Sequence, residues 1–105
     1  MFSPGDTIYA IKHNRTGRIY VGRTQNLKER CSQHFSALKR GKHSIGMMQA
    51  DFDRYGNDFT VSVLKIAETY DTAEEGAWIN KLKTYDPNIG YNYKVPQWGR
   101  MFKTT

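Results

Sequence analysis

Two short β-type segments near the start of the chain, joined by a turn sequence, constrain the fold most strongly. In residues 6–12 the side chains alternate between two faces, and residues 18–22 supply a second, returning segment. Between them, residues 14–17 read Asn-Arg-Thr-Gly, a combination that favours a turn. We therefore expect an antiparallel hairpin in which Tyr9 and Tyr20 lie on neighbouring strands, where they can share a face.

Three helices and a third strand are predicted beyond the hairpin. Asn26, with Glu29 three residues later, forms the capping box of a first helix. This helix runs to about Arg40, and Gly41 stops it. The later elements are a helix over residues 45–55 that Ser44 caps, a strand over residues 59–66, and a helix from Asp71 or Thr72 to about Leu82.

The order of these elements, β-β-α-α-β-α, predicts an α+β fold with a small three-stranded antiparallel sheet flanked by helices. It cannot be drawn as alternating βα units, so a doubly wound parallel sheet is disfavoured. At 105 residues the chain is expected to form a single domain over residues 1–105, with a core over about 7–93 and a tail over 94–105.

The positive charge of the chain is concentrated in its first half. The formal net charge is +6, and residues 12–42 hold nine lysines and arginines against one acidic residue, Glu29. That segment alone therefore carries +8 and the remainder −2. A one-sided basic surface is typical of nucleic-acid binding; the alternative is an ordinary solvated surface. The candidate DNA-binding residues are Lys12, Arg15, Arg18, Arg23, Lys28, Lys39, Arg40 and Lys42.

Several classes of protein are disfavoured. Cys31 is the only cysteine, so we expect no disulfide partner and no multi-cysteine zinc site. No stretch approaches the roughly 18 apolar residues that span a bilayer. The N-terminus shows no secretory signal pattern. We therefore expect a cytoplasmic protein that has no membrane contact.

Two tyrosines and a histidine-arginine pair carry the first chemical signal. Tyr9 or Tyr20 can act as a base if a nearby cation or imidazole lowers a phenol pKa that is ordinarily about 10, although tyrosines also simply pack in strands. Arg30 and His34 lie four residues apart on the edge of the apolar stripe of the first helix. A guanidinium suits phosphate oxygens, and an imidazole can relay a phenol proton. A solvated arginine and a half-buried histidine are the alternative.

Glu75 is the acidic residue that we assign to a metal ion. One carboxylate, completed by water and phosphate oxygens, is an adequate shell for Mg²⁺. The alternative is that Glu75 is the last member of a capping box that begins at Thr72. Asn92 either orients a neighbouring group or serves a turn.

These residues, in this order and spacing, resemble the GIY-YIG nuclease family. The likeness covers about residues 7–93 and is greatest to the catalytic domains of phage intron-encoded homing endonucleases. One departure is Thr7, where the family usually has glycine. The matching set is Thr7-Ile8-Tyr9, Tyr20-Val21-Gly22, Arg30, His34, His43, Glu75 with Trp78 three residues later, and Gly90-Tyr91-Asn92.

The resemblance implies an endonuclease that cuts double-stranded DNA with one Mg²⁺ (or Mn²⁺) ion and leaves 5′-phosphate and 3′-hydroxyl ends. It implies that Tyr9 or Tyr20 activates water, and we favour Tyr9 assisted by His34. It also implies a phage-encoded protein that acts in a bacterial host. The other roles, carried over by position, are Arg30 for the scissile phosphate, Glu75 for the ion, and His43 and Asn92 for support.

Alternative functions stay open at this point. Homing enzymes of this kind carry a separate DNA-binding domain, so this domain is expected to have little sequence specificity of its own. One active site cuts one strand at a time, so cutting both strands requires reorientation or a transient dimer on DNA. The alternatives are a repair, structure-specific or restriction nuclease of the same family, or a non-catalytic nucleic-acid-binding module that tolerates Glu75→Ala.

Overall fold

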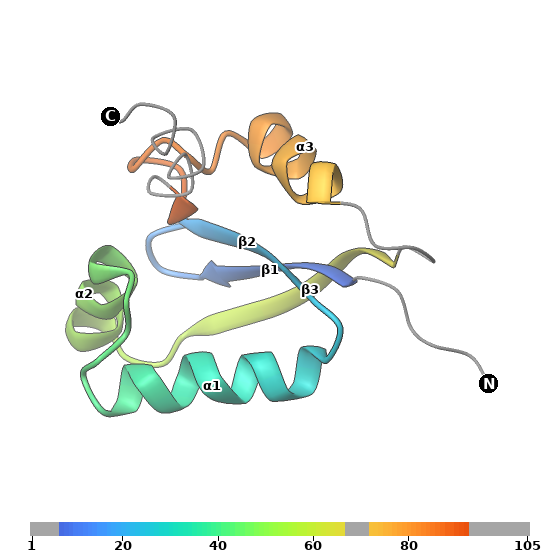
Figure 1. Cartoon of the computed structure of the whole chain (residues 1–105). Coiled ribbons are helices and arrows are strands. Elements are labelled where there is room, and N and C mark those ends of the chain that lie inside the picture. The colour runs from blue at the N-terminus through green and yellow to red at the C-terminus, as the bar shows by residue number, and fades with distance from the viewer. Residues whose placement is uncertain (1–6, 67–71, 93–105) are drawn as a thin grey trace, which may run out of the picture.

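Strand β1 (Thr7–His13) is the centre of a three-stranded sheet and pairs antiparallel with both β2 (Ile19–Thr24) and β3 (Phe59–Ile66). The strand order is β2-β1-β3. The structure, a computed structural model, describes residues 7–66 and 72–92 (Figure 1). The predicted tail over 94–105 and the predicted strand start at position 6 lie outside the described residues.

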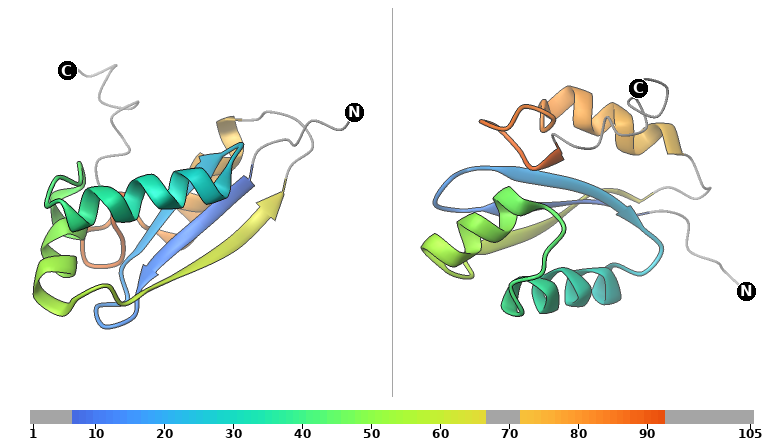
Figure 2. Two further views of the ribbon diagram at one scale, coloured as in Figure 1. Left: turned by 90° about the horizontal axis from the view of Figure 1, so that it is seen from below. Right: turned by 60° about the vertical axis from the view of Figure 1, so that its left-hand side comes forward.

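Three helices complete the order β-β-α-α-β-α: α1 (Leu27–Lys39), α2 (Gly46–Tyr55) and α3 (Thr72–Leu82). Figures 1 and 2 show α1 and α2 on one side of the sheet and α3 on the other. The prediction of an α+β fold with a three-stranded antiparallel sheet flanked by helices is therefore confirmed. Within the described ranges, no helix is long and apolar enough to cross a membrane.

Alternation along β1 divides the core into two layers. Tyr9 and Ile11 pack toward α1 and α2, whereas Ile8 packs toward α3. The first layer also contains the buried residues Leu38, Met48 and Tyr91, and the second contains Val21 and Ile79. Because successive strand residues face opposite sides, this register puts both Tyr9 and the predicted helix-edge residues of α1 on the same side of the sheet.

Local capping signals position α1 as predicted. The backbone N–H of Glu29 donates to the side-chain oxygen of Asn26 over 3.1 Å, which satisfies a donor that the helix itself leaves free. Arg40 ends the helix, and Gly41 follows with a φ of +70°, a conformation that glycine adopts without strain.

The cap predicted for α2 is wrong. Ser44 does not cap it; the helix begins after Ile45 and has no side-chain cap. The preceding loop is held instead by His43, whose backbone N–H donates to the side chain of Gln49 over 2.9 Å. Tyr55, the last residue of α2, is 37% exposed, and its ring lies against that of the buried His13 with 5.8 Å between centroids.

A buried carboxylate joins three parts of the chain. Asp51 of α2 is 6% exposed. Both of its oxygens accept hydrogen bonds from the Arg18 guanidinium, over 3.1 and 3.0 Å. The hydroxyl of Tyr91 donates to the same carboxylate over 2.6 Å, and the hydroxyl of Thr16 over 3.3 Å. The hairpin turn, α2 and the segment before residue 92 are thus tied together by one side chain.

Candidate active site

Tyr9 and Tyr20 lie side by side on the face of the sheet that α1 covers. In the hairpin register Tyr9 is opposite Gly22 and Tyr20 is opposite Ile11, so the tyrosines are diagonal neighbours. Their ring centroids are 6.1 Å apart, and the His34 ring lies 6.2 Å from Tyr9 and 5.1 Å from Tyr20. The expectation that the two tyrosines share a face is confirmed.

The environment of the pair opposes ionisation in the free protein. Burial raises the pKa of Tyr9 well above its ordinary value, the neighbouring Tyr20 raises it further, and the charge of Arg30 lowers it. Burial also raises the pKa of Tyr20, and the negative charge of Glu75 adds to that rise. Tyr9 is fully buried, whereas Tyr20 is partly exposed. Both are therefore neutral phenols at neutral pH.

Gly22 makes room for this arrangement. A Cβ atom at position 22 would lie 2.5 Å from the hydroxyl oxygen and from Cζ of Tyr9, and 2.8 Å from Cε2 of Tyr20. Any side chain there would displace the tyrosines, because real Cβ atoms do not approach so closely. The glycine of the Tyr20-Val21-Gly22 motif is therefore explained by the Tyr9 side chain that crosses it.

For the nuclease activity that the resemblance implies, Gly22→Ala is expected to lower the rate of DNA cleavage about 100-fold, because a displacement of about 1 Å in a reacting group costs that much. Gly46→Ala is the matched control, since a Cβ atom at position 46 meets nothing within 4 Å. Single-turnover cleavage by the two variants measures the effect. Equal rates for both variants would show that the tyrosine positions do not matter.

Two histidines, His34 and His43, connect the hydroxyl of Tyr9 to the loop before α2. Nε2 of His34 lies 3.1 Å from the Tyr9 hydroxyl, and Nδ1 of His34 lies 2.8 Å from Nε2 of His43. The backbone N–H of Ile45 donates to Nδ1 of His43 over 3.0 Å. Burial, together with His43 and Arg30, lowers the pKa of His34 to about 4, and burial lowers the pKa of His43.

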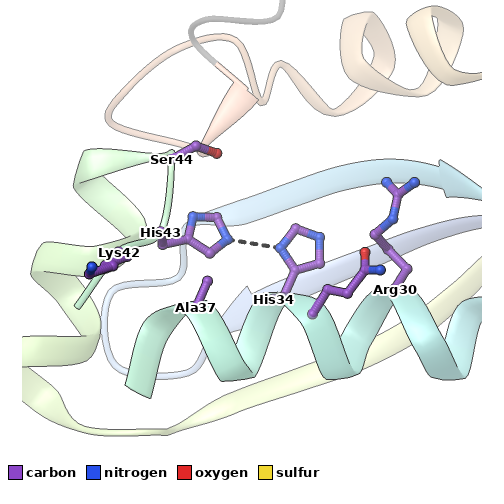
Figure 3. A pocket seen from close by; sticks show the side chains of 7 residues that line it. Arg30, His34, Ala37, Lys42, His43 and Ser44 are labelled. Atoms are coloured by element: carbon purple, nitrogen blue, oxygen red, sulfur yellow. Dashed lines mark hydrogen bonds between the residues drawn. The ribbon is translucent and has the colours of Figure 1, made fainter. Parts of the chain in front are cut away.

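Arg30 and these histidines line a hollow along α1. Its volume is about 290 Å³. Figure 3 shows Arg30 at one end and Lys42 at the other, with the bonded pair His34 and His43 between them. The remaining lining residues are Gln33, Ala37 and Ser44. The hollow is therefore bordered by two cationic side chains, which suit a phosphate group.

Glu75 belongs to α3, which lies on the other side of the sheet from α1 (Figure 1). It lies in the first turn of α3 with 27% of its side chain exposed, and its Oε1 is 3.9 Å from Nε of Arg23. Its charge acts on Tyr20 strongly enough to raise the pKa of that phenol. The possible cap at Thr72 falls outside the described side chains.

A metal ion at this place would draw few ligands from the protein. Among the residues that the structure describes, no three His, Cys, Asp or Glu side chains gather in a way that could hold a metal. A fully protein-coordinated ion therefore does not fit. A Mg²⁺ ion held by the carboxylate of Glu75, with water and substrate oxygens as its other ligands, does fit.

Asn92 supports β2 and does not enter the hollow. It is fully buried, its Oδ1 accepts from the backbone N–H of Val21 over 2.7 Å, and its Nδ2 donates to the backbone oxygen of Val21 over 2.9 Å. The side-chain amide thus reproduces the pairing of a neighbouring strand. Because Val21 separates Tyr20 from Gly22, this bond holds the strand segment that carries the motif.

The eight candidate DNA-binding residues are scattered over several elements. All of them lie in the described part of the chain, and only Lys42 shares the hollow with Arg30. Arg18 is bound to Asp51, and Arg23 lies 3.9 Å from Glu75, so these two have intramolecular partners. The exposed members are Lys12, Arg15, Lys28, Lys39, Arg40 and Lys42.

Sequence inspection missed three groups that organise the site. Gln49 anchors His43 and also donates to the backbone oxygen of Leu38 over 3.0 Å. The backbone N–H of Ile45 binds the His43 ring, and Asp51 anchors Tyr91, the neighbour of Asn92. None has a distinctive sequence signal, because an amide, a backbone group and a carboxylate in a polar helix are all commonplace.

Comparison with known proteins gives consistent matches. The family model "GIY-YIG catalytic domain" matches residues 6–92. Intron-associated endonuclease 1 of Enterobacteria phage T4 is 31% identical over 80 residues, which are 73% of this chain and 33% of the relative. The chain therefore spans about a third of the length of that curated relative.

Two solved structures are similar in fold as well as sequence. Both are of the catalytic domain of the intron endonuclease I-TevI, one of them a glutamate-to-alanine mutant. The mutant gives a TM-score of 0.74 at 31% identity, covering 84% of this chain and 93% of that chain. The other gives 0.72 at 32% identity, covering 84% and 95%.

Proposed function

Since the chain belongs to the GIY-YIG catalytic-domain family of nucleases, we propose that it is a Mg²⁺-dependent DNA endonuclease. It hydrolyses phosphodiester bonds and leaves 5′-phosphate and 3′-hydroxyl ends. The observation that carries this proposal is the meeting of Tyr9, Tyr20 and His34 within about 6 Å of one another, where His34 also lines the hollow together with Arg30.

Tyr9 is the proposed base. After its phenol proton is lost to solvent, the Tyr9 oxygen takes a proton from a water molecule, the water oxygen forms a bond to phosphorus, and the bond from phosphorus to the 3′-oxygen breaks. The released 3′-oxygen takes a proton from solvent and becomes the 3′-hydroxyl. Arg30 binds the non-bridging oxygens, where negative charge accumulates. Because Tyr9 is fully buried in the free protein, the proposal requires that DNA binding admit a water molecule beside it. Tyr20 is the second candidate for the base.

Glu75 is the proposed metal ligand. A divalent ion held there supplies positive charge that stabilises the leaving 3′-oxygen and lowers the pKa of nearby phenol and water. Such charge is needed, because burial keeps both tyrosines protonated in the free protein. The charge of Arg30 also lowers the pKa of both phenols, but the effect of burial outweighs it.

The DNA contacts are assigned to cations on the α1 side of the sheet. Lys42 lines the hollow, and Lys28, Lys39 and Arg40 are exposed on α1 or at its end. Lys12 points to the α3 side by alternation along β1 and is left out, as are Arg18 and Arg23 with their carboxylate partners. Contacts of this kind bind phosphate, so binding depends strongly on salt and little on sequence.

Metal removal tests the proposal. With Mg²⁺, the protein is expected to convert supercoiled plasmid into nicked or linear DNA, and EDTA in excess is expected to abolish that conversion. Religation of the products by DNA ligase, which requires a 5′-phosphate and a 3′-hydroxyl, checks the chemistry of the ends. Binding of plasmid without any cleavage in Mg²⁺ or Mn²⁺ would support the non-catalytic alternative.

A further inference from the structure

A continuous chain of hydrogen-bonding groups runs from the backbone at the start of α2 to the Tyr9 hydroxyl. Its links are Ile45 N–H to His43 Nδ1 (3.0 Å), His43 Nε2 to His34 Nδ1 (2.8 Å), and His34 Nε2 to the Tyr9 oxygen (3.1 Å). Figure 3 shows the middle link between the two imidazoles. The first group of this hydrogen-bonded series, the backbone N–H of Ile45, can only donate a hydrogen bond.

The Ile45 N–H determines which ring nitrogen carries the proton in His43 and in His34. A neutral imidazole carries one N–H and one lone pair. Because Nδ1 of His43 accepts from the Ile45 N–H, the proton of His43 must be on Nε2, facing His34. Nδ1 of His34 must then be the acceptor, and the proton of His34 must be on Nε2, facing Tyr9. Burial keeps both rings neutral at neutral pH, since it lowers the pKa of each.

We propose that the backbone N–H of Ile45 sets the tautomers of His43 and His34, so that His34 donates a hydrogen bond to the Tyr9 oxygen and does not accept its proton. This inference rests on the proposed function in assigning Tyr9 its catalytic role. It reverses the proton relay in which an imidazole takes the phenol proton. His34 instead stabilises the negative charge of an ionised Tyr9, and His43 is a positioning residue that acts through His34.

The reverse order of donors and acceptors, in which Tyr9 donates to His34 and His34 donates to His43, is sterically excluded. If His34 accepted from Tyr9, its proton would be on Nδ1, and Nε2 of His43 would have to be the acceptor. Nδ1 of His43 would then carry a hydrogen that points at the Ile45 N–H, with only 3.0 Å between the nitrogens. Gln49 prevents the ring from moving away, because it binds the His43 backbone N–H over 2.9 Å and the Leu38 oxygen over 3.0 Å.

Long-range ¹H–¹⁵N NMR spectra of the imidazole rings test the proposal directly. These spectra distinguish protonated from unprotonated ring nitrogens, and they are recorded on the free protein at pH 7 without DNA or metal. Both His34 and His43 are expected as the Nε2–H tautomer. A proton on Nδ1 of either ring would overturn the proposal. The result does not depend on nuclease activity, so failure of the inference and failure of the proposed function are distinguishable.

Two substitutions at His43 give a second, kinetic test. Gln in place of His43 keeps an N–H donor near the position of Nε2, whereas Glu offers only an acceptor and turns His34 to its Nδ1–H tautomer. The expected loss of single-turnover rate is at most about tenfold for His43→Gln and about 100-fold for His43→Glu, the range for residues that orient a reacting group through another.

The NMR tautomer of His34 in each His43 variant separates positioning from a merely structural effect. His43→Glu is expected to move the His34 proton from Nε2 to Nδ1, and His43→Gln is expected to leave it in place. Equal rates for the two variants, with the His34 tautomer reversed in His43→Glu alone, would overturn the catalytic part of the inference. A variant that fails to fold leaves the spectra of the parent protein as the deciding measurement.

Discussion

Tyr9→Phe is expected to lower the single-turnover rate of plasmid cleavage by about 10²–10⁴-fold, the range for loss of a general base. The substitution removes one oxygen atom and keeps the ring, which is fully buried in the layer between the sheet and α1. It deletes the group that takes the proton of water and leaves the N–H of His34, 3.1 Å away, without its oxygen partner. Affinity for DNA, measured without metal, is expected to stay within about threefold of the parent, because the substitution removes no charge.

Two further variants give this prediction its controls. Tyr85→Phe removes the hydroxyl of a tyrosine that is 42% exposed, and its cleavage rate is expected to equal that of the parent. Tyr20→Phe is expected to lose less than Tyr9→Phe, because the Tyr9 oxygen is the one that contacts His34. A larger loss for Tyr20→Phe would assign the base to Tyr20, the more exposed of the two.

Asp51→Ala is expected to destabilise the fold by about 3 kcal/mol, the lower end of the range for breaking a buried ion pair. The lower end applies because 25% of the Arg18 side chain is exposed, so that water partly compensates its charge. The hydroxyl of Tyr91, buried 2.6 Å from the carboxylate, also loses its acceptor. The melting temperature should therefore fall by about 10–20 °C, as measured by circular dichroism.

Asp53→Ala is the matched control for Asp51, since it removes an exposed carboxylate from the same helix. Asp53 accepts one hydrogen bond from Gln49 over 3.0 Å, and its loss is expected to cost less than about 1 kcal/mol. If the two variants melt at the same temperature, the network of Asp51, Arg18 and Tyr91 does not hold the hairpin turn to α2.

The fold was predictable where the signals are local. The hairpin follows from alternation and from a turn sequence, and α1 follows from the cap at Asn26 and the glycine at position 41. These interactions join residues close together in the sequence, so their residue types reveal them. The cap of α2 was predicted wrongly, because the loop before it is bonded through His43 and Gln49.

The site was only partly predictable, because its members meet through tertiary contacts. Alternation along the hairpin placed Tyr9 and Tyr20 on one face, and the distance between their rings confirms it. The His34 ring lies beside both of them. Asp51 went unnoticed, since its partners Arg18 and Tyr91 lie 33 and 40 residues away in the sequence. Arg18 and Arg23 counted as phosphate contacts on charge alone, and only the folded chain shows the carboxylates beside them.

The most direct test of a metal-dependent nuclease is plasmid cleavage in Mg²⁺ by the parent, Glu75→Gln and Glu74→Gln. The two glutamates are consecutive in α3 and equally half-buried, but Glu74 binds Lys65 over 2.8 Å, whereas the charge of Glu75 acts on Tyr20 and raises the pKa of that phenol. We expect cleavage by the parent and by Glu74→Gln, and a loss of at least about 100-fold in Glu75→Gln with DNA binding retained. No cleavage by the folded parent, or equal cleavage by the two variants, would contradict the proposal.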